Sequence, residues 1–485
     1  MVDIDTSQIL SIFSTEAWLA LLALVLIAID LISGRGRLTG PADAVRLTAL
    51  AGLALVLVQT FSLEPVVEPS VFGTLDPFAI FFKRFFVASA LFTMFLSGPY
   101  DARLPAGRGE FPAMVVFITM GMSMLASVSD FVTLFVALEL VTITLFLLVA
   151  WRPGLPRSIE AGIKFVVVGA IAASFLIYGT AFVYGGTGSL DFAGVSAALA
   201  AAESTPAGLK FGLLLVLVGL GFKLGAVPFH VWIPDVYQGA PTPVTAFLSV
   251  GSKAAGVVLL MRVVYTVLGP VAAEWVTVLA GLAALTLLMG NLGAITQTDL
   301  KRFLGYSGIA HAGFLLLALA TGSEASASAM LFYMVAYLFT NMTAFLVIII
   351  VSRTADNAHM DRVNGLAERS PFLALALTVS MLSLAGVPPF SGFVAKFMVL
   401  RAAMANATLL PVVILSLVMI VVSLYYYLCV VKRMYFREPV DTSVLEVSAT
   451  SKLVLYVGIL VTFAIGIYMG PLVAASDVGA AALFR

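Results

Sequence analysis

Long apolar stretches, separated by short polar connections, run through almost the whole chain of 485 residues. A helix that crosses the hydrocarbon core of a bilayer needs about 20 mainly apolar residues, and the stretches reach that length about fourteen times. We therefore predict membrane-spanning helices near residues 15–33, 43–62, 77–97, 111–128, 131–150, 158–184, 207–228, 243–267, 271–290, 300–320, 326–352, 371–404, 408–435 and 450–470.

The polar connections between these spans alternate in charge. The odd-numbered connections carry basic residues, among them Arg35, Arg108, Arg152, Lys301, Arg353 and Lys432. The even-numbered connections carry almost none, and they contain Glu64, Glu68, Glu274 and Glu324 instead. Because cytoplasmic loops are enriched in lysine and arginine, we expect the odd connections to be cytoplasmic and both termini to lie on the opposite side.

Two of the predicted spans are interrupted by glycine and proline. The seventh breaks at Gly225 and Pro228, and the twelfth breaks at Gly386, Pro388 and Pro389. The sequences around the two breaks are similar, and the spans are five apart, so they must run in opposite directions across the membrane. Broken helices in inverted repeats are where many transporters place their substrate sites, near the middle of the bilayer.

These patterns predict an all-α polytopic membrane protein that contains two inverted repeats of five helices. Residues 1–110 would form an N-terminal segment of three helices, and residues 111–268, with spans four to eight, the first repeat. Residues 269–437, with spans nine to thirteen, would form the second repeat, and residues 438–485 a C-terminal helix.

Composition narrows the classes of function. Hydrophobic residues make up 61% of the chain, charged residues only 11%, and the formal net charge is zero. A neutral chain without basic runs is not typical of nucleic-acid binding. The single cysteine, Cys429, excludes a disulfide framework and an iron–sulfur cluster with four cysteine ligands. With three scattered histidines and no glycine-rich nucleotide motif, we expect no redox cofactor, metal or nucleotide on this chain.

Five ionisable residues lie near the middle of predicted spans, on five different helices: Glu139, Lys223, Lys253, His311 and Lys396. A charge at the centre of a span costs roughly 2.5–3.5 kcal/mol on insertion scales, so such a residue marks a functional site by default. Burial lowers the pKa of a lysine and a nearby carboxylate raises it, so a moving partner can switch a lysine between holding and releasing a proton. The row predicts a proton relay in the plane of the membrane, with Glu139 and Lys223 as its tunable pair.

Each of these residues also has a structural interpretation. Glu139 and a lysine could form a static ion pair between helices, and Lys253 or His311 could simply bond to neighbours. His230, just after the first break, could satisfy backbone groups that the proline frees. Lys164, about two turns into the sixth span, could extend to the cytoplasmic surface. Lys164 and His230 are therefore secondary candidates for the relay.

Other polar and aromatic residues in the spans are expected to be structural. Lys83 and Arg84 lie early in the third span, outside the repeats, and are expected to be peripheral. The run from Tyr425 through Tyr426 to Tyr427 is expected to pack against helices or to contact lipid rather than to bind a cofactor.

Two segments of the chain resemble signatures of the antiporter-like membrane subunits of bacterial respiratory complex I. The first runs from Phe222-Lys223 to Ser252-Lys253 and includes Asp235-Val-Tyr-Gln-Gly-Ala-Pro-Thr-Pro-Val244. The second is Asp299-Leu-Lys-Arg-Phe-Leu-Gly-Tyr-Ser-Gly-Ile-Ala-His311. The family has three paralogous subunits. In its first segment and in Lys396, this chain resembles the subunit nearest the middle of the membrane arm. A second type would be expected to have glutamate at position 396, and the third carries a long lateral helix for which this chain has no room after its last span.

The resemblance implies a proton-translocating subunit of NADH:quinone oxidoreductase that is driven by quinone reduction elsewhere in the complex. In the family's scheme, Glu139 and Lys223 would be the charge pair of the cytoplasm-facing half-channel. Lys253 and His311 would be the central connection, and Lys396 would release a proton outward. The resemblance also implies a bacterial inner membrane with both termini periplasmic. Its expected partners are lipid, the other antiporter-like subunits and the small membrane subunits, with FMN and iron–sulfur clusters on other subunits.

Two other functions stay open at this point. A subunit of a multi-subunit cation/proton antiporter shares this fold, although the segment 235–244 argues against it. A spacer of the membrane arm that moves no protons is the other, and the cost of burying five ionisable groups argues against it.

Overall fold

The computed structural model of the chain describes residues 6–32, 41–66, 73–103, 109–353, 357–440 and 445–484, so that Arg35, Glu68 and Arg108 of the charge pattern lie outside the described residues. Within these ranges the chain is helical, and its β interactions are two isolated bridges, Asp130–Asp191 and Asp299–His359. The predicted all-α membrane class is therefore confirmed.

The helices follow the predicted spans closely. Their bounds are α1 (Thr6–Ile12), α2 (Ser14–Ile32), α3 (Pro41–Thr60), α4 (Pro77–Ser97), α5 (Glu110–Ser127), α6 (Phe131–Val149), α7 (Pro156–Thr187), α8 (Phe192–Ala201), α9 (Ala207–Leu224), α10 (Trp232–Gly239), α11 (Thr242–Phe247), α12 (Lys253–Met261), α13 (Ala272–Ile295), α14 (Leu300–Thr321), α15 (Glu324–Val351), α16 (Leu366–Arg369), α17 (Pro371–Ala385), α18 (Ser391–Ala403), α19 (Leu410–Phe436), α20 (Ala449–Ile467) and α21 (Gly470–Ala481).

Among the described residues, twelve helical segments are long and apolar enough to cross a membrane. Two further predicted spans fall on α3 and on the pair α17 and α18; the segment Ala44–Thr60 of α3 and the helix α17 are shorter apolar helices. The count of fourteen therefore stays a prediction. The part predicted as one C-terminal helix contains two, α20 and α21, because the chain is interrupted at Tyr468 and Met469 before Gly470-Pro471.

Aspartate residues in the connections begin several of the helices. Asp76, Asp130, Asp191 and Asp299 are the N-caps of α4, α6, α8 and α14, and each side chain accepts hydrogen bonds from first-turn backbone N–H groups. Such a cap satisfies donors that have no partner inside the helix. The acidic residues at the ends of the spans therefore have a local structural task that is separate from any proton relay.

The two broken spans have the same backbone geometry. Gly225 follows α9 with φ of 79°, and Gly386 follows α17 with φ of 85°. At each break the N–H groups of the glycine and of the next residue donate to carbonyls in the last turn of the helix. The acceptors are Gly221 and Phe222 at the first break, and Leu382 and Ser383 at the second. This is the Schellman type of helix end, which requires a left-handed residue. The shared geometry explains why the sequences around the breaks are alike.

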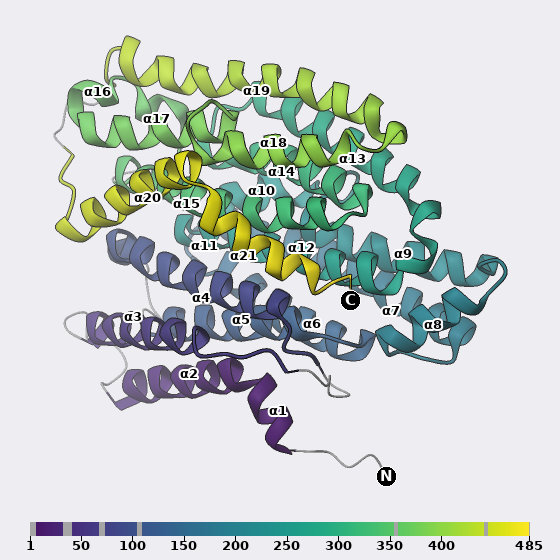
Figure 1. The fold of residues 1–485 in the computed structure, drawn as a ribbon. Coiled ribbons are helices and arrows are strands. Elements are labelled where there is room, and N and C mark those ends of the chain that lie inside the picture. Colours follow the sequence, from purple (N-terminus) through teal and green to yellow (C-terminus); the bar gives the residue numbers. More distant parts are fainter. Residues whose placement is uncertain are drawn as a thin grey trace.

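The helices lie side by side in several rows, with α2 and α3 at one edge and α17 and α19 at the other (Figure 1). The segment Thr242–Val267, which contains α11 and α12, is buried along its length, and α14 and α15 are buried almost as completely. The segment from 242 to 267 includes two π-helical stretches, Leu248–Ser252 and Arg262–Val267. These central helices carry Lys253 and His311, so two candidate residues lie in the middle of the bundle.

Replacement of Gly225 tests the geometry of the first break. We expect Gly225→Ala to lower the free energy of unfolding by about 1–2 kcal/mol, because an L-residue resists the left-handed conformation. The new methyl group would also meet Ile233 Cδ1. The measurement is thermal unfolding of the purified full chain in detergent.

The matched control is Gly281→Ala in α13, where nothing lies within 4 Å of the added Cβ. Alanine is the better helix former, so the control should be neutral or stabilising. Equal stability of Gly225→Ala and the control would contradict a left-handed conformation of Gly225 at the first break.

Candidate functional site

The five candidate residues lie on five helices: Glu139 on α6, Lys223 on α9, Lys253 on α12, His311 on α14 and Lys396 on α18. The three lysines and the histidine are between 3% and 5% exposed, whereas Glu139 is half-buried. Because a buried ammonium group is costly unless it is hydrogen-bonded, the partner of each lysine decides what the lysine can do.

Lys223 and Glu139 lie close together without touching. Lys223 Nζ donates to Thr142 Oγ1 at 3.0 Å. Lys223 and Glu139, both in the described part of the chain, form no direct ion pair. Glu139, Thr142 and Lys223 line one cavity of about 10 Å³, which is about the size that holds a single water molecule. Sequence reasoning missed Thr142, although it lies one helical turn after Glu139.

Lys253 begins α12, directly after the first π-helical stretch. Its Nζ donates to the backbone carbonyl of Gly308 on α14 and lies 5.5 Å from the centre of the Tyr337 ring. A π-helical stretch inside an α-helix is frequent at functional sites. Both of these Lys253 contacts are made by uncharged groups.

His311 is surrounded by tyrosines. Its Nδ1 lies 2.5 Å from the Tyr333 hydroxyl and its Nε2 lies 3.3 Å from the Tyr427 hydroxyl. The Tyr427 hydroxyl also bonds Ser307 Oγ at 2.5 Å. These groups form a continuous hydrogen-bonded cluster across α14, α15 and α19.

The tyrosine run was only partly predicted. Tyr425 is exposed on the apolar surface, as expected for a residue that packs or contacts lipid. Its two neighbours are buried and pack between helices, also as expected, but their hydrogen bonds were not predicted: the Tyr427 hydroxyl bonds His311 Nε2, and Tyr426 donates to Asn291 Oδ1 at 3.0 Å. The signal in the sequence was a pair of hydroxyl groups in a span with few other polar residues.

Lys396 is held by the end of the broken helix before it. Its Nζ donates to the carbonyls of Leu384 at 2.8 Å and Ala385 at 3.1 Å, and it lies 5.2 Å from the centre of the Phe314 ring. The last carbonyls of a helix have no intrahelical partner and carry the negative end of the helix dipole. The break at Gly386 therefore provides the acceptors that Lys396 needs.

Helix α14 connects the last three residues of this row, Lys253, His311 and Lys396. Gly308 accepts from Lys253, His311 lies one turn later, and the Phe314 ring, a further turn on, faces Lys396. Because a helix rises about 1.5 Å per residue, these three positions span about 9 Å along α14. The structure thus brings Lys253, His311 and Lys396 to one helix.

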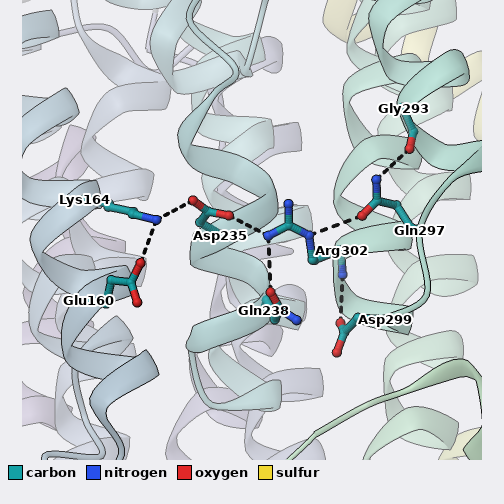
Figure 2. A network of polar contacts seen from close by, with 8 residues as sticks. All are labelled: Glu160, Lys164, Asp235, Gln238, Gly293, Gln297, Asp299 and Arg302. Atoms are coloured by element: carbon teal, nitrogen blue, oxygen red, sulfur yellow. Dashed lines mark hydrogen bonds and ion pairs between the residues drawn. The ribbon is translucent and has the colours of Figure 1, made fainter.

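The secondary candidates lie apart from this row. Lys164 is 43% exposed and pairs with Glu160 at 2.8 Å and with Asp235 at 2.6 Å. Asp235 lies between Lys164 and Arg302, whose guanidinium approaches it at 2.5 Å (Figure 2). His230 is a buried residue in the connection between α9 and α10. The network of Figure 2 ties the second half of the broken span, α10, to α7 and α14.

Lys83 lies on α4, outside the predicted repeats, and its burial and its ion pair were not predicted from the sequence. It is 0% exposed, and its Nζ bonds both carboxylate oxygens of Glu16 at 2.8 Å and the carbonyl of Ile12 at 2.8 Å. Nearby in the fold, Arg262 bonds both oxygens of Asp76, at 2.6 and 2.8 Å. These pairs fasten α2 to α4 and α4 to the end of α12.

Comparisons with known proteins agree on one family. A family model described as "NADH:quinone oxidoreductase/Mrp antiporter, TM" matches residues 128–423. The NADH-quinone oxidoreductase subunit N of Heliobacterium modesticaldum is 40% identical over 479 residues, which cover 98% of this chain and 99% of that protein. The protein of the same name from Moorella thermoacetica is 39% identical over 465 residues, 96% of each chain.

Solved structures show the same fold. A chain of respiratory complex I from Thermus thermophilus with bound aureothin has a TM-score of 0.80 and 33% identity, over 95% of this chain and 98% of that one. A chain of the Mrp complex from Dietzia has a TM-score of 0.84 at 22% identity, over 98% of both chains, and this likeness concerns the fold alone.

The Glu16–Lys83 pair can be tested by removing one partner. We expect Glu16→Gln to destabilise the chain by about 3–5 kcal/mol, because it leaves a buried ammonium group without its charge partner. The double variant Glu16→Gln/Lys83→Met should recover most of that loss. Thermal unfolding of the full chain is the measurement.

Glu160→Gln is the control, because the Glu160–Lys164 pair is exposed and exposed pairs contribute little. If Glu16→Gln cost no more than this control, the pair would not hold the N-terminal helices together.

Proposed function

Because this chain belongs to the NADH:quinone oxidoreductase/Mrp antiporter family of membrane subunits, we propose that it translocates protons as an antiporter-like subunit in the membrane arm of a respiratory NADH:quinone oxidoreductase. Curated relatives along nearly the full chain are subunits N of that enzyme. The solved relative at 33% identity belongs to respiratory complex I.

The observation that carries the proton function is the kind of partner that each buried lysine has. Lys223, Lys253 and Lys396 are hydrogen-bonded to a hydroxyl or to backbone carbonyls, all of them uncharged. Lys83 is equally buried but bonds both oxygens of a carboxylate. A lysine fixed to a carboxylate stays charged, whereas one held by neutral oxygens can gain or lose its proton when the charge nearby changes.

The proposed path begins at Glu139 and Lys223. A water in the cavity that they share would link the carboxylate to the ammonium group, which supports their proposed role as the pair of the cytoplasm-facing half-channel. Helix α12 packs on α9, so Lys253 is the next lysine in the row. Movement of a proton between Glu139 and Lys223 would change the charge that Lys253 experiences.

The proposed central and outer parts of the path follow α14. Lys253 and His311 are the central connection, and the Tyr333 and Tyr427 hydroxyls hold the imidazole and can exchange protons with it. Lys396 is the group that releases a proton outward. Lys164, which pairs with Asp235, is a secondary relay group at the cytoplasmic end. His230 is a secondary relay group at the first break.

In this proposal the energy comes from outside the chain. Quinone reduction on other subunits, which carry FMN and iron–sulfur clusters, drives the relay electrostatically, and we propose no redox or nucleotide site on this chain. Its partners are the other antiporter-like subunits and the small subunits of the membrane arm. We place it in the bacterial inner membrane with both termini periplasmic. In Figure 1, α1 lies at the right-hand end of α2, and α21 runs from the left to an end right of the centre, which supports termini on one side.

The alternative is a subunit of a multi-subunit cation/proton antiporter, which the shared fold of the Mrp chain favours. The identity of about 40% to subunits N along nearly the whole chain argues for the first function. Purification of the native complex separates the two. NADH-oxidising partners would support the respiratory function, and only small antiporter partners would refute it.

The relay is tested by neutralising Lys223 in the assembled complex. We expect Lys223→Met, and likewise Glu139→Gln, to lower coupled proton pumping by about tenfold or more, since loss of a positioned proton-transfer group commonly costs at least that much. Pumping is measured in inverted vesicles with NADH and quinone. Quinone reduction in detergent, measured in parallel, reports on assembly.

The matched control is Lys210→Met on the same helix, because Lys210 is 46% exposed and pairs with Glu274 at the surface. It should pump normally. Normal pumping by both Lys223→Met and Glu139→Gln, with intact quinone reduction, would refute the relay and favour a subunit that only spaces its neighbours.

A further inference from the structure

A second polar site lies away from the proton row, at the ends of α3, α4, α15 and α20. These four helix ends meet at the face of the molecule that carries the basic connections, at the left-hand side of Figure 1. They enclose a pocket of about 340 Å³ whose lining includes Arg46 and Arg353 and the hydroxyl residues Ser448 and Thr450. No step of the proposed proton path uses these residues.

The floor of this pocket is apolar. Leu47 and Leu50 of α3, Met94 and Phe95 of α4 and Ile350 of α15 line it beneath the polar residues. A pocket with a cationic rim and an apolar floor is amphiphilic, so it matches a ligand that has a negative head and an apolar body.

A neighbouring cavity of about 670 Å³ extends the cationic rim. It shares Arg353, Glu446 and Ser448 with the first pocket and adds Arg369 and Lys452. The two cavities together are therefore lined by four cations, Arg46 included, and by one carboxylate. Arg353 and Lys452 make no ion pair with another described residue. The positive charges of Arg353 and Lys452 therefore line the cavity without a carboxylate partner among the described residues.

The N-terminus of α20 adds to the same potential. Ser448 is its N-cap, and Thr450 and Ser451 of its first turn line the pocket. A helix of this length, 19 residues, carries partial positive charge at its N-terminus and favours a phosphate group there.

The two helices at the mouth of the pocket are covered with exposed apolar side chains. Leu47 on α3 is 61% exposed, and Leu453 and Leu460 on α20 are 63% and 69% exposed. In a chain that crosses the membrane, such faces lie against acyl chains. The pocket therefore opens toward lipid at the depth of the headgroups.

We propose that this site binds an anionic phospholipid of the leaflet on the basic side. Its phosphodiester would lie between Arg353, Lys452 and the N-terminus of α20, and its acyl chains would run down the exposed faces of α3 and α20. Basic pockets between membrane helices on this side are where anionic headgroups bind. Charge complementarity selects phosphatidylglycerol or cardiolipin over a zwitterionic lipid. The site is independent of proton movement, so it goes beyond the proposed function.

The experiment measures lipid binding to the full chain after delipidation. Phosphatidylglycerol and phosphatidylcholine are added separately in detergent, and bound lipid is counted by native mass spectrometry. We expect phosphatidylglycerol to bind, and phosphatidylcholine to bind at least about tenfold more weakly. The double variant Arg353→Gln/Lys452→Gln should weaken the binding of phosphatidylglycerol by a similar factor.

Two further variants keep the test decisive. Lys432→Gln removes an exposed cation on the same face but outside the pocket lining and should leave binding unchanged. Thr450→Glu places a carboxylate in the first turn of α20, where the helix dipole stabilises it, so the fold is kept while a phosphodiester is repelled.

The outcomes distinguish the occupants. Loss of phosphatidylglycerol in the double variant and in Thr450→Glu, with Lys432→Gln unaffected, supports the proposal. Undiminished binding in those two variants overturns it. Displacement of the lipid by millimolar inorganic phosphate identifies a free-phosphate site and overturns the lipid assignment. Absence of any selective lipid binding, with an acidic segment of a co-purified subunit cross-linked at Arg353, overturns it in favour of a protein partner.

Discussion

A lysine inside a membrane protein needs a hydrogen-bond acceptor from the protein itself, because the hydrocarbon core offers no water to provide one. In this chain a helix break meets that need most directly. The interruption at Gly386 leaves the carbonyls of Leu384 and Ala385 without intrahelical partners, and Lys396 donates to both of them. The break and the buried charge are therefore two parts of one arrangement. The first break has the same backbone geometry, and Lys223 lies in the last turn of the helix that ends there.

The chain contains buried lysines of two kinds, and the difference lies in their partners. Lys83 is fixed to Glu16 by two hydrogen bonds and fastens the N-terminal helices. Lys253 is equally buried but bonds only a carbonyl and faces the Tyr337 ring. A fixed ion pair stabilises a fold by keeping both charges, whereas a proton carrier must be able to change its charge. Burial alone does not distinguish these functions, because every one of these lysines is buried.

Charged pairs gather at the ends of the helices, while neutral acceptors dominate the middle. Asp235 forms ion pairs with Lys164 and Arg302 near one face. The cations around Arg353 lie at the ends of helices on the basic face. Water and lipid headgroups screen such charges, so they can anchor helices at modest cost. In the middle, where screening is weak, hydroxyl groups, carbonyls and aromatic rings surround the ionisable groups.

The local sequence predicted the membrane helices, the two breaks and the buried ionisable residues, because hydropathy, glycine, proline and charge are local properties that act through a known membrane thickness. It also indicated the family, through two contiguous segments. The partner of each buried charge could be read only from the packing of the helices. Thr142 beside Lys223, the tyrosines around His311 and the distant partner of Lys83 depend on how helices pack, and Glu16 and Lys83 are 67 residues apart. A contact between helices leaves no trace in the local pattern of either one, so a buried lysine that is ion-paired and one that is held by uncharged oxygens look alike in the sequence.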